Sequence, residues 1–186
     1  MTKLVFALLA VLLAAAGAPT ASAQSAAGPD AYAFFESLDA AGCVSTSVSV
    51  AVYSDARTAE VWFQQYDSCA LAPGEEAPPV VRESSGTGSV SVRIGSTLDV
   101  ARLRAAVPVV DRITGRAYTV AIDLTWRGVG EAEQTQATDC AARTRVTTTT
   151  RYASASGTVV AEGTNLSPSA STDGYLTRAR SARIRC

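Results

Sequence analysis

Apolar and polar residues alternate along most of the chain after residue 30, as they do in strands with one buried face. The clearest case is 101–127, where two alternating runs flank the dipeptide Thr114–Gly115. If this dipeptide forms a tight turn, Val109 lies opposite Val120 and the apolar side chains of both runs share one face. The pattern therefore predicts an antiparallel hairpin over 101–127.

The same alternation predicts further short strands, separated by Gly, Ser and Asp. They are expected at 43–54, 59–69, 89–94, 144–153, 158–161 and 175–185. The segment 32–38 could form a strand or a short helix opened by Asp30, and its clustered Tyr and Phe favour a strand. Short strands without helical periodicity are typical of an all-β domain. We expect an antiparallel β-sandwich formed as a single domain, with a β-barrel as the alternative. Residues 70–88 are acidic and rich in Pro and Gly, and they are predicted to form an exposed loop.

The first 23 residues have a different pattern. Lys3 precedes an uncharged apolar run over 4–18, and Ala21-Ser22-Ala23 matches a cleavage site, as in a secretory signal peptide. The run is shorter than the roughly 20 residues that a membrane-spanning helix needs. We therefore expect a signal peptide at 1–23 and a domain at 24–186. The mature chain is expected to have no membrane span and to be secreted or held in the periplasm or at the cell surface.

The chain has four cysteines, Cys43, Cys69, Cys140 and Cys186, and an even number in an exported protein predicts two disulfides. Folding the hairpin 43–69 about its turn places Cys43 opposite Cys69, at a separation that a disulfide spans. Cys140 then pairs with Cys186 and ties down the last strand. No pair has the short spacing of a zinc site, and there is no histidine, so no metal is expected.

Composition restricts the catalytic chemistry. The chain has no histidine, and its only lysine is Lys3, so a mature protein cannot form Ser-His-Asp, Cys-His or Ser-Lys arrangements. Glycine-rich nucleotide-binding motifs are absent, and no cofactor is expected. We therefore expect a protein that is not an enzyme. A glycoside hydrolase remains an alternative because its mechanism needs only two carboxylates. The candidates for this role are Asp67, Glu75, Glu76 and Asp123.

Charge is distributed unevenly along the chain. Residues 24–100 hold ten acids and three arginines, whereas 101–186 hold seven acids and twelve arginines. Arg143 and Arg145 share parity on one predicted strand, and Arg178 and Arg180 share parity on the strand that the second disulfide brings alongside. A change of parity near Ser181 predicts a bulge, with Arg183 beyond it. The four arginines 143, 145, 178 and 180 are predicted to form one basic face.

Such a face suits an extracellular anionic glycan, another anionic polymer or an acidic protein partner. Nucleic acid is disfavoured because few aromatic residues interleave with the arginines. A simpler interpretation is that the arginines keep the strands soluble and block edge-to-edge aggregation.

Two other features suggest interaction sites. Trp62 and Phe63 are neighbours on a strand and face opposite sides, so one of them is expected to be exposed, and a patch near Trp62 is the second candidate for ligand contact. The segment 70–88 offers an alternative function, as the inserted loop of a secreted protease inhibitor. Our leading hypothesis is an exported, non-catalytic binding or structural domain that uses the arginine face.

Overall fold

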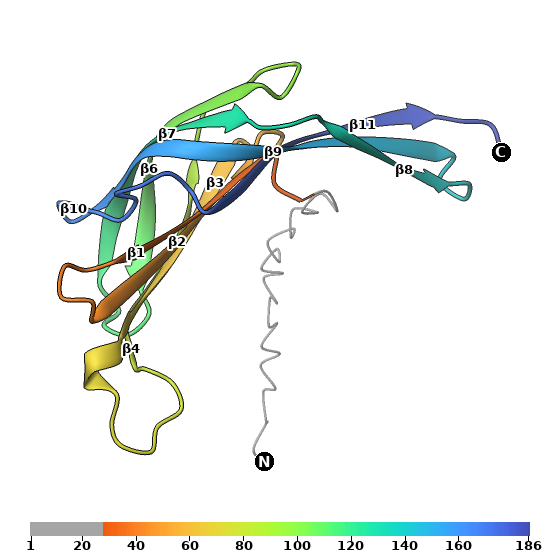
Figure 1. The fold of residues 1–186 in the computed structure, drawn as a ribbon. Coiled ribbons are helices and arrows are strands. Elements are labelled where there is room, and N and C mark those ends of the chain that lie inside the picture. Colours follow the sequence, from red (N-terminus) through yellow and green to blue (C-terminus); the bar gives the residue numbers. More distant parts are fainter. Residues whose placement is uncertain (1–27) are drawn as a thin grey trace, which may run out of the picture.

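The structure is a computed structural model that describes residues 28–186, so the predicted signal peptide lies outside the described residues. Its elements are strands, apart from the 3-10 turn η1 (Ser68–Ala70). The strands are β1 (Ala31–Leu38), β2 (Val44–Tyr53), β3 (Thr58–Asp67), β4 (Val80–Ser89), β5 (Val92–Ile94), β6 (Val100–Asp111), β7 (Ala117–Gly128), β8 (Glu133–Asp139), β9 (Thr144–Ala161), β10 (Thr164–Asn165) and β11 (Asp173–Arg183). The predicted all-β class is confirmed (Figure 1).

All strand pairings are antiparallel, and they form a closed circuit. The circuit runs from β1 through β2, β3, β4, β6, β7, β9 and β11 and back to β1. Its shortest junction joins β4 to β6, where only Ser84 and Ser85 are paired. Pro108 of β6 lies just beyond this junction and has no N–H to extend the ladder. A Cβ on Gly86 would stand 1.9 Å from the Pro108 carbonyl oxygen, so only glycine permits this close approach.

The circuit encloses one apolar interior built from every second residue of its strands. Its largest fully buried side chains include Phe35, Phe63, Leu103, Ile122 and Trp126. Trp126 also donates a hydrogen bond from its indole N–H to the carbonyl oxygen of Tyr32, at 2.8 Å. Burial of this apolar surface is the main force that holds the strands together.

The hairpin over 101–127 forms, but the predicted register is wrong by two residues. Val120 pairs with Val107 instead of Val109. The turn is longer than a dipeptide because the Asp111 carboxylate accepts hydrogen bonds from the N–H groups of Ile113 and Thr114, both at 2.9 Å. A shift of two residues preserves the face of each side chain, so the apolar face was predicted correctly.

Three other boundaries differ from the prediction. Residues 80–88 were assigned to the exposed loop but belong to β4, which pairs with β3 through a register that the sequence pattern did not reveal. The strands predicted at 144–153 and 158–161 are one strand, β9. Gly157 permits this continuity, because its φ is 133° and a Cβ there would lie 2.0 Å from the Asp123 carbonyl oxygen. Strand β8 was missed because its residues are all exposed and show no apolar alternation.

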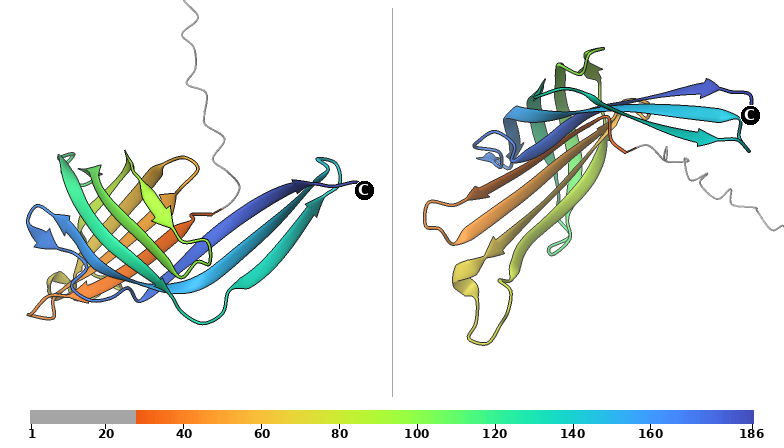
Figure 2. Two further views of the ribbon diagram at one scale, coloured as in Figure 1. Left: turned by 90° about the horizontal axis from the view of Figure 1, so that it is seen from above. Right: turned by 45° about the vertical axis from the view of Figure 1, so that its right-hand side comes forward.

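Three strand segments project away from the rest of the sheet (Figure 2). They are β8, residues 144–151 of β9 and residues 177–183 of β11, and we call them the arm; the remaining described strands are the body. Within the arm β9 lies between β8 and β11.

Both predicted disulfides are present. Cys43 pairs with Cys69, with their Cα atoms 5.2 Å apart, and Cys140 pairs with Cys186 at 5.7 Å. The second disulfide joins the chain terminus to the tip of the arm. Two disulfides indicate an oxidising, extracytoplasmic environment. Within residues 28–186 no helix has the length and apolar character needed to cross a bilayer.

Candidate functional site

The arm carries a polar face that continues the apolar face of the body. In β9, the buried Ala153 and Ala155 face the interior, and Arg151, Thr149 and Thr147 follow on the same side as the strand enters the arm. In β11, the buried Leu176 is followed in the same way by Arg178 and Arg180. We call this side the inner face of the arm. On this side, β9 and β11 therefore carry apolar residues within the body and threonine and arginine within the arm.

Strand pairing aligns the inner face in rows of three side chains. Gln134, Thr149 and Arg178 form the row nearest the body. Gln136, Thr147 and Arg180 form the next row, and Thr138, Arg145 and Ala182 form the row nearest the tip. None of these nine positions holds an aspartate or a glutamate.

The structure brings together three of the four predicted arginines, namely Arg145, Arg178 and Arg180. Arg143 does not join them, because it lies in the turn at the tip with a φ of 52° and precedes the start of β9. The Asp139 side chain closes this turn by accepting a hydrogen bond from the Ala142 N–H at 3.0 Å.

The predicted bulge near Ser181 is also absent. Pairing between β11 and β9 continues without a shift through Ser181 and Ala182 to Arg183. Arg183 consequently faces the side of the arm opposite to Arg178 and Arg180. Each of the three rows of the inner face therefore holds one arginine, and Arg183 is not among them.

Trp62 lies elsewhere on the molecule. Phe63 faces the interior and is fully buried, whereas Trp62 is half-buried on the outer face of β3 between Ser49 and Ser85. Because the inner face of the arm continues the interior side of the sheet, Trp62 and the arginines are on opposite sides. The structure does not combine the two candidate contact regions into one site.

A pocket of about 220 Å³ lies where the inner face of the arm meets the loop between β5 and β6. Its lining consists of Ser96, Thr97, Leu98, Gln134, Thr147, Thr149, Arg178 and Arg180. The Arg178 guanidinium fixes the loop by donating hydrogen bonds to the carbonyl oxygens of Ser96, at 2.9 Å, and Gly95, at 3.2 Å. Leu98 is buried with a φ of 57°, a conformation that is uncommon outside glycine.

The arginine beneath this loop has a carboxylate partner. Arg151 pairs with Asp99, which also accepts a hydrogen bond from the Thr97 hydroxyl. The hydrogen bond from Thr97, followed by that from Arg151, lowers the pKa of Asp99 below its ordinary value. The Nε atom of Arg151 is buried and has no acceptor within residues 28–186.

By contrast, Arg145, Arg178 and Arg180 form no ion pair within the described part of the chain. The hydrogen bonds of Arg178 go to neutral carbonyl groups, which leave its positive charge uncompensated. Besides Arg151, whose charge Asp99 matches, the inner face therefore presents three positive charges that have no carboxylate partner within the described residues.

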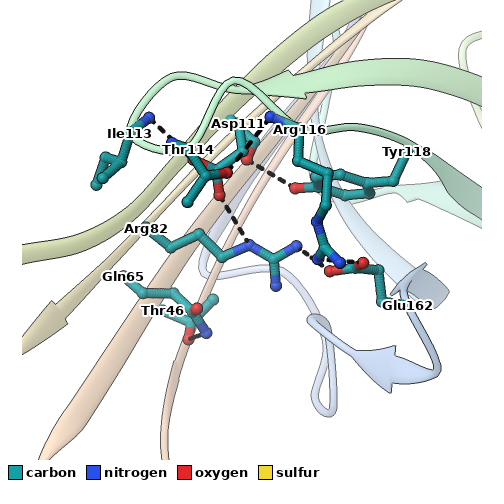
Figure 3. A network of polar contacts seen from close by, with 10 residues as sticks. Thr46, Gln65, Arg82, Asp111, Ile113, Thr114, Arg116, Tyr118 and Glu162 are labelled. Atoms are coloured by element: carbon teal, nitrogen blue, oxygen red, sulfur yellow. Dashed lines mark hydrogen bonds and ion pairs between the residues drawn. The ribbon is translucent and has the colours of Figure 1, made fainter.

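A second polar cluster lies at the opposite end of the interior (Figure 3). Arg82 pairs with Glu162 at 2.5 Å and with Asp111 at 3.6 Å, and its guanidinium lies over the rings of Phe63 and Tyr118. Arg116 shares Glu162. Hydrogen bonds from the N–H groups of Thr114 and then Ile113, together with the Arg82 charge, lower the pKa of Asp111 despite its burial. The charges of this cluster are matched within the protein.

Sequence reasoning missed the loop residues of the pocket. Ser96 and Arg178 are separated by 82 residues, and no local pattern indicates that they meet. It also missed Arg93, Arg102 and Arg127 on the outer surface of β5, β6 and β7, where Arg93 is directly opposite Arg102. Their exposed positions in an alternating strand were the signal that could have found them. Like charges directly opposite one another on neighbouring strands repel. Arg93, Arg102 and Arg127 are a group of three arginines away from the arm, and they serve as a control for the arginines of the inner face.

The carboxylates considered for hydrolase chemistry have structural contacts. Asp67 accepts hydrogen bonds from the N–H groups of Cys69 and Ala70 at the start of η1, and Asp123 pairs with Arg104 on the outer surface of β7. Among residues 28–186 there is no group of three or more His, Cys, Asp or Glu side chains arranged to hold a metal ion. Neither observation supplies a catalytic site.

Comparison with models of known protein families, with curated proteins and with solved structures found no match.

Proposed function

We propose that the protein is an exported, non-catalytic binding domain that holds an anionic polymer on the inner face of its arm. The observation that carries this proposal is the alignment of Arg145, Arg178 and Arg180 on one face, without a carboxylate partner within residues 28–186. Guanidinium groups form strong, charge-assisted hydrogen bonds with carboxylates, sulfates and phosphates.

The shape of the arm favours an extended ligand over a compact one. Arg178 and Arg180 are two residues apart on one strand, so their Cα atoms are roughly 6.6 Å apart. Arg145 adds a third charge in the row nearest the tip. A polymer with repeated negative charges can contact all three arginines at once, and each contact releases counterions to the solvent.

Export is supported by two independent features. The segment 1–23 has the charge, apolar run and cleavage pattern of a secretory signal peptide. The two disulfides are stable in an oxidising compartment, where extracellular polymers are the available polyanions. The proposed ligand is therefore an extracellular anionic glycan or wall polymer.

Retention of the oxidised mature protein on immobilised heparin tests the proposal. We expect retention near pH 7.5 at low salt and elution within a few hundred millimolar NaCl, because salt competes with the released counterions. The underivatised matrix is the control. Flow-through at low salt would contradict polymer binding, and release of new chain ends from the bound polymer would contradict the non-catalytic part of the proposal.

A further inference from the structure

The pocket at the base of the arm offers hydrogen-bond donors on several sides. Arg178 and Arg180 contribute guanidinium N–H groups, Thr147 and Thr149 contribute hydroxyls, and Gln134 contributes a side-chain amide. The lining contains no carboxylate. The nearest acidic residue of the loop, Asp99, is engaged by Arg151 and by the Thr97 hydroxyl. A lining rich in donors and in uncompensated positive charge suits a ligand that has only acceptors.

The pocket is also preorganised. Burial of Leu98 fixes the loop to the body, and the left-handed backbone conformation of this residue costs roughly 1 kcal/mol or more in a non-glycine residue. The two hydrogen bonds from Arg178 to Gly95 and Ser96 hold the loop against the arm. A guanidinium that is already fixed loses little conformational entropy when it binds an anion.

The size of the pocket limits what enters it. Its volume of about 220 Å³ lies below the range of roughly 300–1,000 Å³ that is usual for sites enclosing a whole drug-sized molecule. One charged substituent of a polymer fits this space, while the chain of the polymer continues along the inner face. The donors of β8, β9 and β11 lie side by side on the inner face, and the loop between β5 and β6 completes the lining.

We infer that the pocket is a specific site for a tetrahedral oxyanion, the sulfate or phosphate ester group of the bound polymer. This inference rests on the proposed function, since it names the group that the arm recognises. The three terminal oxygens of such an ester can accept from Arg178, Arg180 and the hydroxyls together. A planar carboxylate has two oxygens and leaves part of this donor set unused.

Titration with inorganic anions tests the pocket without any polymer. Sodium sulfate, sodium phosphate and sodium acetate are added to the isotope-labelled, oxidised mature protein at constant ionic strength, and backbone amide shifts are followed by NMR. We expect saturable shifts at Thr147, Thr149 and the 96–98 loop with sulfate and phosphate, and at least fivefold weaker binding of acetate. Equal affinity for acetate, or small unsaturable shifts spread over all exposed arginines, would overturn the inference.

Two matched variants locate the binding. Arg180→Gln removes a pocket charge that has no ion-pair partner within residues 28–186, and we expect it to weaken sulfate and phosphate binding at least tenfold. Arg145→Gln removes an equal charge from the same face outside the pocket, and we expect less than a threefold change. Equal losses in both variants would show a diffuse basic face instead of a pocket.

Polymers then separate the source of the group from the proposed function. Heparin, desulfated heparin and polyphosphate are compared for binding to the unmodified protein and to the Arg180→Gln variant. Tight binding of heparin alone assigns a sulfate group, and tight binding of polyphosphate alone assigns a phosphate group. If desulfated heparin binds as tightly as heparin, the pocket inference is overturned, while the proposal of polymer binding stands. Inorganic sulfate binding without binding of any polymer would overturn the proposed function while the pocket stands.

Discussion

Arginines lie at both ends of the interior, but within the described residues Arg178 and Arg180 lack the carboxylate partners that Arg82 has. At one end, Arg82 is enclosed by Asp111, Glu162 and two aromatic rings, so its charge is satisfied inside the protein. At the other end, Arg178 and Arg180 face a pocket without a carboxylate in its lining. Both sets extend from the same apolar face of the sheet, which makes them comparable.

This difference separates structural from functional charge. A charge that is partly withdrawn from water is stabilising only when partners compensate for its lost hydration, and the Arg82 cluster provides these partners. Exposed arginines on the arm keep their hydration and contribute little to folding. Their charges remain available to a ligand. The comparison therefore predicts that removal of Arg82 affects stability, whereas removal of Arg180 affects binding.

The largest expected effect concerns the arm as a whole, which has no apolar core of its own and depends on the Cys140–Cys186 disulfide at its tip. In the chain-entropy model a bridge with a sequence separation of 46 contributes about 4 kcal/mol. We expect the double substitution Cys140→Ser and Cys186→Ser to accelerate amide hydrogen exchange in β8 and in the arm portions of β9 and β11. Hydrogen exchange with mass spectrometry measures this change strand by strand.

The body is the internal control for this experiment. Protection of β2, β3 and β7, whose inward side chains form the core, should stay close to that of the unmodified protein. A loss of protection that is uniform over the arm and the body would show that the two regions unfold as one cooperative unit, and would contradict the view of the arm as a separately held extension.

A smaller effect is expected from Arg82→Gln, which leaves Asp111 without its ion-pair partner, while Glu162 keeps Arg116. Because the Arg82 side chain is 21% exposed, we expect the free energy of unfolding to fall by about 2–3 kcal/mol, which is less than the roughly 3–5 kcal/mol for breaking a fully buried pair. Urea unfolding followed by tryptophan fluorescence measures the change. The matched substitution Arg180→Gln should alter stability by no more than about 0.5 kcal/mol. Equal destabilisation by both substitutions would remove the distinction between the two ends.

The smallest effect is a pH dependence at Asp111. Its pKa is lowered in the folded protein, so its contribution to stability is present above the ordinary value of 3.8 and is lost as pH falls through the lowered value. Asp111→Asn keeps an acceptor for the Ile113 and Thr114 N–H groups but removes the charge. We expect a loss of about 1–2 kcal/mol at pH 6 that shrinks once the pH falls below 3.8 and disappears only below the lowered pKa. A loss that stays constant as the pH falls below 3.8 would assign the effect to packing instead of charge.

The sequence predicted the strands whose two faces differ in polarity. Alternation located β2, β3, β6 and β7, clustered aromatic residues indicated β1, and hairpin symmetry with elimination identified both disulfides. The alternation pattern did not predict β8, because the side chains of this strand are exposed on both faces and do not alternate in polarity. The pairing register of the 101–127 hairpin could not be predicted either, because the side chain of Asp111 lengthens the turn without changing which side chains point inward.

The candidate site was predictable in part, for a similar reason. Parity along single strands placed Arg178 with Arg180, and the second disulfide indicated that Arg145 lies alongside them. The pocket also needs the 96–98 loop, which reaches the arm through the burial of Leu98 and the contacts of Arg178. Such contacts depend on how the whole sheet curves, and local patterns contain no information about them.

The most direct test of the account compares two triple variants on immobilised heparin. One replaces Arg145, Arg178 and Arg180 of the arm with glutamine, and the other replaces Arg93, Arg102 and Arg127 on the outer surface of the body, so the net charge changes equally. The account predicts that the arm variant is no longer retained at low salt, while the body variant elutes close to the unmodified protein. Equal shifts in both variants, or a larger shift in the body variant, would contradict the claim that the arm is the binding region.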